Sequence, residues 1–201
     1  MNIGVLGGTF DPIHRGHIMM AEETRTRLDL AEVFFVPAYL TPLKEDSSIL
    51  AVEHRVQMVR LAIADNPHFI LSTVEIDRAG PSYTVDTIVE LREKLGAENE
   101  LFFIAGWDSL AQLSRWKEPS RIIQMSRLVA VPRPGCSLPD LNSLETVIPG
   151  LTQRLIVLDR PEIDISATEI RERVARGLPV DHLVPEPVAE YISKNKLYSK
   201  R

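Results

Sequence analysis

Short apolar runs alternate with amphipathic helical segments, and this alternation restricts the possible fold more than any other feature of the sequence. The apolar runs are Ile3 to Leu6, Val33 to Val36, Phe69 to Val74, Leu101 to Ala105, Leu128 to Val131 and Leu155 to Leu158. Hydrophobicity within each run is continuous, which is typical of strands buried on both faces. Apolar stripes at helical spacing are formed by Val52, Val56, Val59 and Ile63, and by Val85, Ile88, Val89 and Leu95. The pattern predicts an α/β fold in which a doubly wound, mostly parallel sheet carries helices on both faces.

The same pattern predicts where ligands bind. In open parallel sheets, ligands lie beyond the carboxyl ends of the strands, so we expect the site in the loops after the first, second and fourth strands. The segment from Arg133 to Gly150 is rich in Pro, Gly and Ser, and we interpret it as a long surface excursion. Residues 1–201 are therefore expected to form a single domain.

Composition excludes several classes of function. The formal charge of −5 is spread along the chain, which argues against a nucleic-acid-binding surface. No run approaches the roughly 20 apolar residues that span a bilayer, and the N-terminus lacks the features of a signal peptide. Cys136 is the only cysteine, so a thiolate metal site is excluded and no metal site is expected. These features predict a cytoplasmic protein that contacts neither membrane nor nucleic acid.

The first strand ends in a glycine turn followed by two histidines, in the string Gly-Gly-Thr-Phe-Asp-Pro-Ile-His-Arg-Gly-His over residues 7–17. Gly7 and Gly8 let the backbone approach a ligand, and the next helix offers free N–H groups to an anion. The string is neither the dinucleotide fingerprint nor a P-loop. His14 and His17 could both face one phosphate chain if the helix begins near residue 16. The alternative is an ordinary strand-to-helix turn with two surface histidines.

This string resembles the opening signature of the nucleotidyltransferase superfamily, and in particular of the bacterial nicotinate-nucleotide adenylyltransferases. The resemblance implies a Rossmann-like fold. It also implies that His14 and His17 are catalytic and contact the ATP phosphates. The ATP-binding residues implied in this turn are Gly7, Gly8, Thr9, Phe10, His14 and His17.

A second candidate phosphate segment follows the last predicted strand. Ser166 and Glu169 have the spacing of a capping box, while Thr168 and Arg171 lie on one face near the expected helix start, where they could grip an anion. The segment is similar to the I-S-S-T-x-I-R signature of the family, with Ala167 in place of the second serine. The resemblance implies that Ser166, Thr168 and Arg171 bind ATP, and that Arg171 is catalytic.

Two loops are expected to complete the nucleotide sites. Lys44, in a loop that resembles the P-P-H-K loop of the family with Leu43 in place of histidine, is expected to reach ATP. Asp108, in Gly-Trp-Asp, matches the aspartate that contacts ribose, although Trp107 is larger than the small residue expected there.

The acceptor side is expected around residues 75–87 and 113–117. The first segment reads as a Gly-Pro turn capped into a helix by Thr84 or Ser82, and it is similar to E-x-x-R-x-G-P-S-Y-T-x-D-T of the family. The resemblance implies that Tyr83 and Thr84 bind the nicotinate nucleotide. It also implies that the Trp116 indole, in L-x-R-W-K, stacks on the pyridine ring.

Together these resemblances imply an enzyme of NAD biosynthesis that transfers AMP from ATP to nicotinate mononucleotide. Mg²⁺ is expected to enter with ATP, because the segments offer no carboxylate cage for it. Nicotinamide mononucleotide or phosphopantetheine are alternative acceptors, and a non-catalytic nucleotide sensor is an alternative from another class. The sequence leaves the oligomeric state open, including a homo-oligomer.

Overall fold

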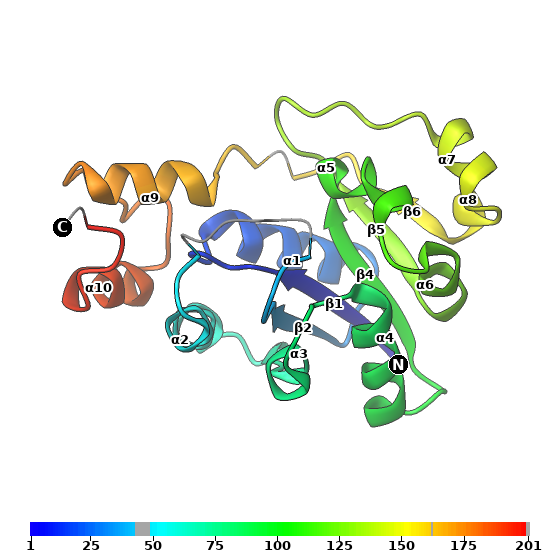
Figure 1. Ribbon diagram of the computed structural model, residues 1–201, viewed down its shortest axis with the longest axis horizontal. Coiled ribbons are helices and arrows are strands. Elements are labelled where there is room, and N and C mark those ends of the chain that lie inside the picture. The colour runs from blue at the N-terminus through cyan, green and yellow to red at the C-terminus, as the bar shows by residue number, and fades with distance from the viewer. Residues whose placement is uncertain (43–48, 162, 200–201) are drawn as a thin grey trace.

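A computed structural model describes residues 1–42, 49–161 and 163–199. Within them a single six-stranded parallel sheet has the strand order β3-β2-β1-β4-β5-β6 (Figure 1). The strands are β1 (Asn2–Gly8), β2 (Glu32–Pro37), β3 (Phe69–Leu71), β4 (Glu100–Gly106), β5 (Arg127–Val131) and β6 (Leu155–Val157). The predicted α/β, doubly wound, Rossmann-like fold is confirmed.

Strand β1 lies at the centre of the sheet, between β2 and β4. Its register pairs Val5 with Phe34 on one side and with Phe103 on the other. From β1 the chain adds β2 and β3 on one side of the sheet, and it then returns to add β4, β5 and β6 on the other side. This is the switch point at which open parallel sheets leave a crevice for ligands.

The third apolar run was predicted three residues too long, and the sixth run, Leu155 to Leu158, one residue too long. Only Phe69–Leu71 is a strand, because β3 is an edge strand that pairs with β2 over three residues. Val74, expected to end this strand, instead begins helix α3 (Val74–Arg78), where its side chain is buried. A short helix therefore separates β3 from the Gly-Pro turn.

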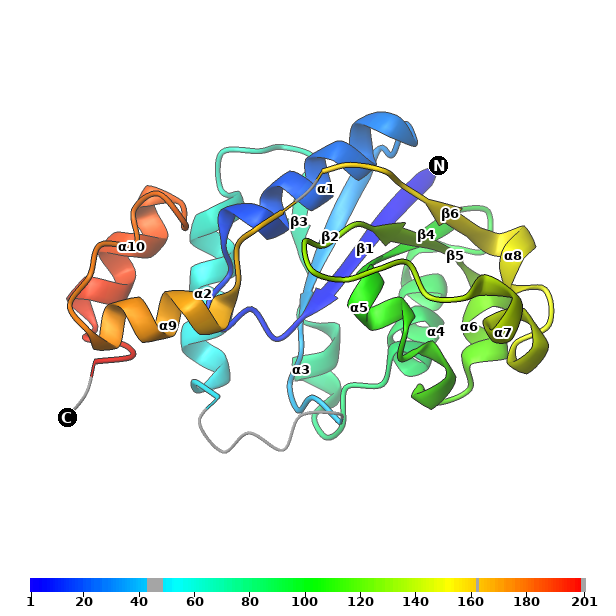
Figure 2. The same ribbon diagram turned by 90° about the horizontal axis from the view of Figure 1, so that it is seen from above.

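Two hydrophobic clusters cover the two faces of the sheet. One contains apolar residues of α1 (Arg15–Arg27), α2 (Val52–Ile63), α9 (Ala167–Ala175) and α10 (Glu186–Lys194). The other contains apolar residues of α4 (Thr84–Leu95), α6 (Pro119–Met125), α7 (Leu141–Val147) and α8 (Leu151–Arg154). The remaining short elements are α5 (Trp107–Leu110) and the 3-10 helix η1 (Leu113–Arg115). Figures 1 and 2 both place α9 and α10 at the α2 end of the molecule, and α7 and α8 at the other end.

The segment from Arg133 to Gly150 is less irregular than expected, since it contains α7. Asp140 caps this helix by accepting a hydrogen bond from the Asn142 backbone N–H at 3.0 Å. Leu144 and Ile148 are buried four residues apart, which places both on one face of the turn. Asn142, Ser143, Thr146 and Val147 are exposed, so the segment is a surface excursion that contains a helix.

In the described part of the chain, no helix is both long and apolar enough to cross a membrane.

Candidate active site

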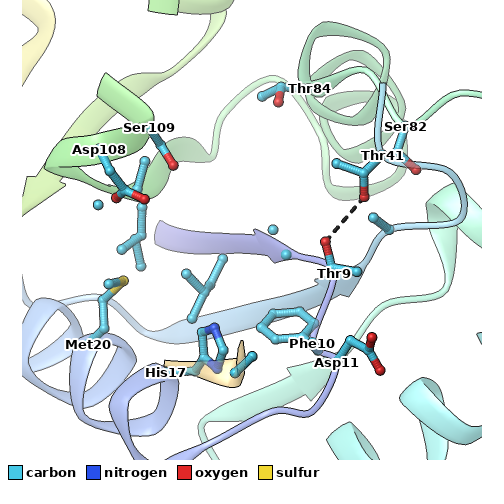
Figure 3. A pocket seen from close by; sticks show the side chains of 18 of the residues that line it. Thr9, Phe10, Asp11, His17, Met20, Thr41, Ser82, Thr84, Asp108 and Ser109 are labelled. Atoms are coloured by element: carbon cyan, nitrogen blue, oxygen red, sulfur yellow. Dashed lines mark hydrogen bonds between the residues drawn. The ribbon is translucent and has the colours of Figure 1, made fainter. Parts of the chain in front are cut away.

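A cavity of about 550 Å³ opens beyond the carboxyl ends of the strands. It is lined by residues after β1, β2, β4 and β5, by the start of α4 and by the start of α9. Figure 3 shows Phe10 and His17 on one side, with Asp108 and Ser109 of α5 and Thr84 of α4 on others. The cavity lies at the predicted edge of the sheet, and it also draws on β5, which the sequence did not indicate.

The structure brings the candidate residues from distant segments to this one cavity. Those that line it are Gly7, Gly8, Thr9, Phe10, His14, His17, Tyr83, Thr84, Asp108, Trp116, Ser166, Thr168 and Arg171. Lys44 and Leu43 lie outside the described residues. Loop residues near them do line the cavity, and the Thr41 hydroxyl lies 3.2 Å from that of Thr9.

Helix α1 sets the geometry of the two histidines. It begins at Arg15, so His14 is the N-cap residue and His17 lies in the first turn. The rings stack with centroids 3.7 Å apart and planes 26° from parallel. His17 Nδ1 accepts a hydrogen bond from the His14 backbone N–H at 3.2 Å, and Phe10 packs edge-on against the His17 ring at 5.0 Å. Both imidazoles are thus held on one wall of the cavity.

The His14 imidazole is buried and uncharged. Burial, with a smaller contribution from the Arg133 charge, lowers the pKa of His14 to about 4. Its Nδ1 is buried without a hydrogen-bond partner among the described residues. His14 is therefore a neutral imidazole at pH 7, placed to interact with a ligand that enters the cavity.

Helix α9 contributes a second wall. Ser166 is its N-cap, and the Ser166 hydroxyl accepts from the Glu169 backbone N–H at 3.1 Å, which is the serine half of the expected capping box. Arg171 Nη2 approaches Thr168 Oγ1 at 3.4 Å, and Arg171 Nη1 donates to the Asp11 carbonyl oxygen at 2.8 Å. A guanidinium, a hydroxyl and a helix N-terminus thus converge where an anion would be favoured.

Arg133 is a cavity residue that the sequence reasoning missed. It follows the carboxyl end of β5 directly after Pro132, and its guanidinium pairs with Asp108 Oδ2 at 2.8 Å. The rule that ligand-binding residues follow parallel strands could have indicated it, but a single arginine in a Pro-rich loop matched no motif. Asp108, the candidate ribose contact, is therefore already engaged by a cation.

The acceptor side is built differently from the capping that we expected. The N-cap of α4 is Tyr83, which makes no side-chain capping bond, and Thr84 is already the first helical residue. Ser82 Oγ instead accepts from the Tyr39 backbone N–H at 2.8 Å, which ties this turn to the loop after β2. The predicted cap by Thr84 or Ser82 was wrong, because Thr84 lies inside the helix and Ser82 lies one residue before the N-cap.

The two tryptophans have separate environments. The Trp116 indole lines the cavity and packs edge-on against Phe103 at 5.7 Å. Trp107 packs among apolar side chains of the second hydrophobic cluster, and its Nε1 is buried without a partner among the described residues. Its bulk is therefore accommodated against this cluster, where the residue is half-buried.

A buried polar network lies beneath the acceptor loop, and the sequence did not indicate it as a site feature. Glu75, which lines the cavity, accepts from the Thr87 hydroxyl at 2.6 Å. Burial raises the pKa of Glu75, against hydrogen bonds from Ser82 and Thr87 that lower it. The carboxyl group thus fixes the turn that carries Tyr83.

Among the residues that the structure describes, no cluster of three or more His, Cys, Asp or Glu side chains could hold a metal ion.

Known proteins resemble this chain in sequence and in fold. A family model described as cytidylyltransferase-like matches residues 5–173. Dehalococcoides mccartyi strain BAV1 has a protein named "Probable nicotinate-nucleotide adenylyltransferase" that is 48% identical over 201 residues, covering 100% of this chain and 98% of that protein. A protein of the same name from Roseiflexus sp. strain RS-1 is 48% identical over 196 residues, covering 98% and 97%.

Solved structures share the fold. Plasmodium falciparum nicotinic acid mononucleotide adenylyltransferase complexed with NaAD matches with a TM-score of 0.79 at 20% identity, covering 98% of this chain and 97% of that one. The same protein complexed with APC matches with a TM-score of 0.78, covering 98% and 96%.

Proposed function

Because this chain belongs to the cytidylyltransferase-like family and, within it, to the nicotinate-nucleotide adenylyltransferases, we propose that it transfers AMP from ATP to nicotinate mononucleotide. The products are nicotinate adenine dinucleotide and pyrophosphate. The observation that carries the proposal is the convergence of the stacked His14 and His17 rings with Thr168 and Arg171 of α9 on one cavity.

The reaction needs positioning and charge neutralisation more than proton transfer. The acceptor phosphate is largely dianionic near pH 7, so its oxygen attacks the α-phosphorus of ATP without a general base. That bond forms as the bond from the α-phosphorus to the bridging oxygen breaks, and pyrophosphate leaves in line. The residues of the cavity hold the two anions together and stabilise the charge on the phosphate oxygens.

The two walls divide these tasks. On the phosphate side, the His14 and His17 imidazoles, the Arg171 guanidinium, the Thr168 hydroxyl and the free N–H groups of α9 donate to ATP. The Gly7–Gly8 turn leaves the β1 end open to the nucleotide, and Asp108 receives its ribose.

On the acceptor side, Tyr83, Thr84 and Trp116 bind nicotinate mononucleotide. The first backbone N–H groups of α4 donate to the nicotinate carboxylate, and the Trp116 indole stacks on the ring. This arrangement favours the acid over the amide, because a carboxylate gains more than an amide from a helix N-terminus.

MgATP is the proposed donor substrate. Mg²⁺ retains most of its waters and commonly binds through substrate phosphates, so it needs few ligands from the protein. We infer that it arrives with ATP.

A comparison of acceptors tests the function. Purified protein is given MgATP with nicotinate mononucleotide, nicotinamide mononucleotide or phosphopantetheine, and pyrophosphate release is measured. The highest kcat/KM is expected with nicotinate mononucleotide. Equal values for the acid and the amide would refute the proposed acceptor, and no release with any acceptor would favour a nucleotide sensor.

Replacement of His17 tests the catalytic assignment. His17→Ala is expected to lower kcat roughly 100-fold, the scale for removal of one preorganised donor. His182→Ala, at an exposed histidine that does not line the cavity, is the matched control and should retain wild-type kcat. Wild-type turnover by folded His17→Ala protein would contradict the assignment.

A further inference from the structure

We propose that Tyr198 is a positioning residue for ATP, acting through Asp11 on the guanidinium of Arg171. The inference rests on the proposed function, since it concerns the phosphate side of that active site. It gives the chain segment after α10 a role in substrate binding.

Tyr198, near the end of the sequence, contacts the loop that follows β1. Its hydroxyl donates to Asp11 Oδ1 at 2.7 Å, although the two residues are 187 positions apart. Burial and the neighbouring carboxylate both raise the pKa of Tyr198, so the phenol stays protonated and donates at physiological pH. Tyr198 also has a φ of 60°, a backbone conformation uncommon for a residue other than glycine.

Asp11 in turn holds Arg171. The Asp11 side chain is buried, with 5% of the residue exposed. Its backbone carbonyl accepts from Arg171 Nη1 at 2.8 Å, while its Oδ2 lies 4.0 Å from the same nitrogen. The Leu50 backbone N–H also reaches Oδ2, at 3.4 Å. One carboxylate is therefore held between Tyr198 and Leu50, close to the guanidinium without a full ion pair.

This arrangement controls how much of the guanidinium remains available to ATP. With Oδ1 held by Tyr198, the carboxylate keeps its orientation, and Arg171 keeps its side chain on the cavity wall beside Thr168. Without the phenol, the carboxylate is free to turn toward Arg171, and a closer pair would compete with the triphosphate for the same N–H groups. Loss of the hydroxyl should therefore weaken ATP binding more than any other step.

The variant Tyr198→Phe tests this by removing one hydroxyl. We expect the KM for ATP to rise about fivefold, the scale of one lost hydrogen bond. The kcat and the KM for nicotinate mononucleotide should change less than twofold. Tyr191→Phe is the matched control, because it removes a hydroxyl that contacts His54 Nδ1 at 2.9 Å and does not line the cavity. Equal KM values for ATP in the two variants would overturn the proposal.

A double-mutant cycle separates positioning from a general loss of structure. ATP affinity is measured by calorimetry, with Mg²⁺ and without acceptor, for the wild type, Tyr198→Phe, Arg171→Ala and the double variant. We expect the second substitution to add no further loss of affinity. A full additional loss would show that Tyr198 acts independently of Arg171. Because this measurement needs no turnover, it remains decisive even if the wild-type protein releases no pyrophosphate, an outcome that would refute only the proposed acceptor chemistry.

Discussion

Burial keeps the His14 imidazole neutral over the pH range in which an exposed histidine takes up a proton. Its pKa is lowered to about 4, while His17, stacked against it, shares the same wall of the cavity. A neutral imidazole costs less to bury than a cation, and it still has one N–H to donate. The fold thus supplies a donor at His14 without the repulsion that two adjacent imidazolium ions would bring.

The stability of the protein should record this lowered pKa. Between pH 6.5 and about 4 the unfolded chain binds a proton at His14 that the folded chain does not, so this residue makes unfolding easier as the pH falls through that window. A pKa lowered from 6.5 to about 4 corresponds to a loss of stability on the order of 3 kcal/mol. Denaturant unfolding of wild type and His14→Gln across this range checks it. The difference between the two should depend on pH, and a constant difference would contradict the prediction.

Gly16 is required by the packing between the two histidines and the segment before α9. A Cβ added at Gly16 would overlap Ile163 Cγ2 and would lie 2.9 Å from His14 Nδ1. Gly16→Ala is therefore expected to destabilise the fold by about 1–3 kcal/mol and to lower kcat, since the His14 ring must move. Thermal unfolding and steady-state kinetics measure both effects. In an Ile163→Ala background the added Cβ has more room, so a cost as large as that in wild type would count against this explanation.

At the scale of elements, Arg55 joins α2 to the loops that form the cavity. It is 2% exposed, and its guanidinium donates to the carbonyl oxygens of Thr9, Ala38 and Leu50 at 2.8, 2.7 and 2.9 Å. These carbonyls belong to the loops after β1 and β2 and to the entry into α2. One side chain thus fixes three segments that the sheet alone leaves free.

Replacement of Arg55 should loosen this junction. Arg55→Met leaves several buried carbonyl groups without donors, and each costs about 1–3 kcal/mol. The free energy of unfolding should fall by several kcal/mol, as measured in urea. Arg60→Met, on an exposed position of the same helix, should change it by about 0.5 kcal/mol or less. A similar loss of unfolding free energy in both variants would show that the hydrogen bonds of Arg55 to these loops do not stabilise the fold.

The elements that the sequence predicted are those whose pattern is local. Continuous apolar runs identified the central strands, because a buried parallel strand needs no contribution from distant residues to be recognised. The short helices α3 and α7 were missed, since one or two turns show too little periodicity to separate from a loop or strand end. Sequence motifs identified the predicted cavity residues. The roles of Arg133, Arg55 and Tyr198 depend instead on contacts between segments far apart in sequence. Such contacts become visible only in the folded chain.

At the scale of the whole molecule, the cavity draws its walls from both halves of the sheet, so ligands that fill it should stabilise both halves. MgATP at 100 times its Kd is expected to contribute about 2.7 kcal/mol. For a chain of 201 residues this raises the Tm by about 5–10 °C. Differential scanning calorimetry with MgATP, and with MgCl₂ alone as control, measures the shift. Arg171→Ala should show a smaller shift at the same ATP concentration, and an undiminished shift would place ATP away from α9.

The central position of β1 also governs how the protein can be divided. Strands β1 to β3 precede Gly96 in the chain and β4 to β6 follow it, yet β1 and β4 pair directly beneath the cavity. A peptide cut in the turn before β4 would leave the histidines on one fragment, and Asp108, Trp116 and Arg171 on the other. Neither fragment could bring donor and acceptor together, and activity would return only when the two reassociate along the β1–β4 edge. A split reporter built at this turn would therefore read out that pairing through catalysis.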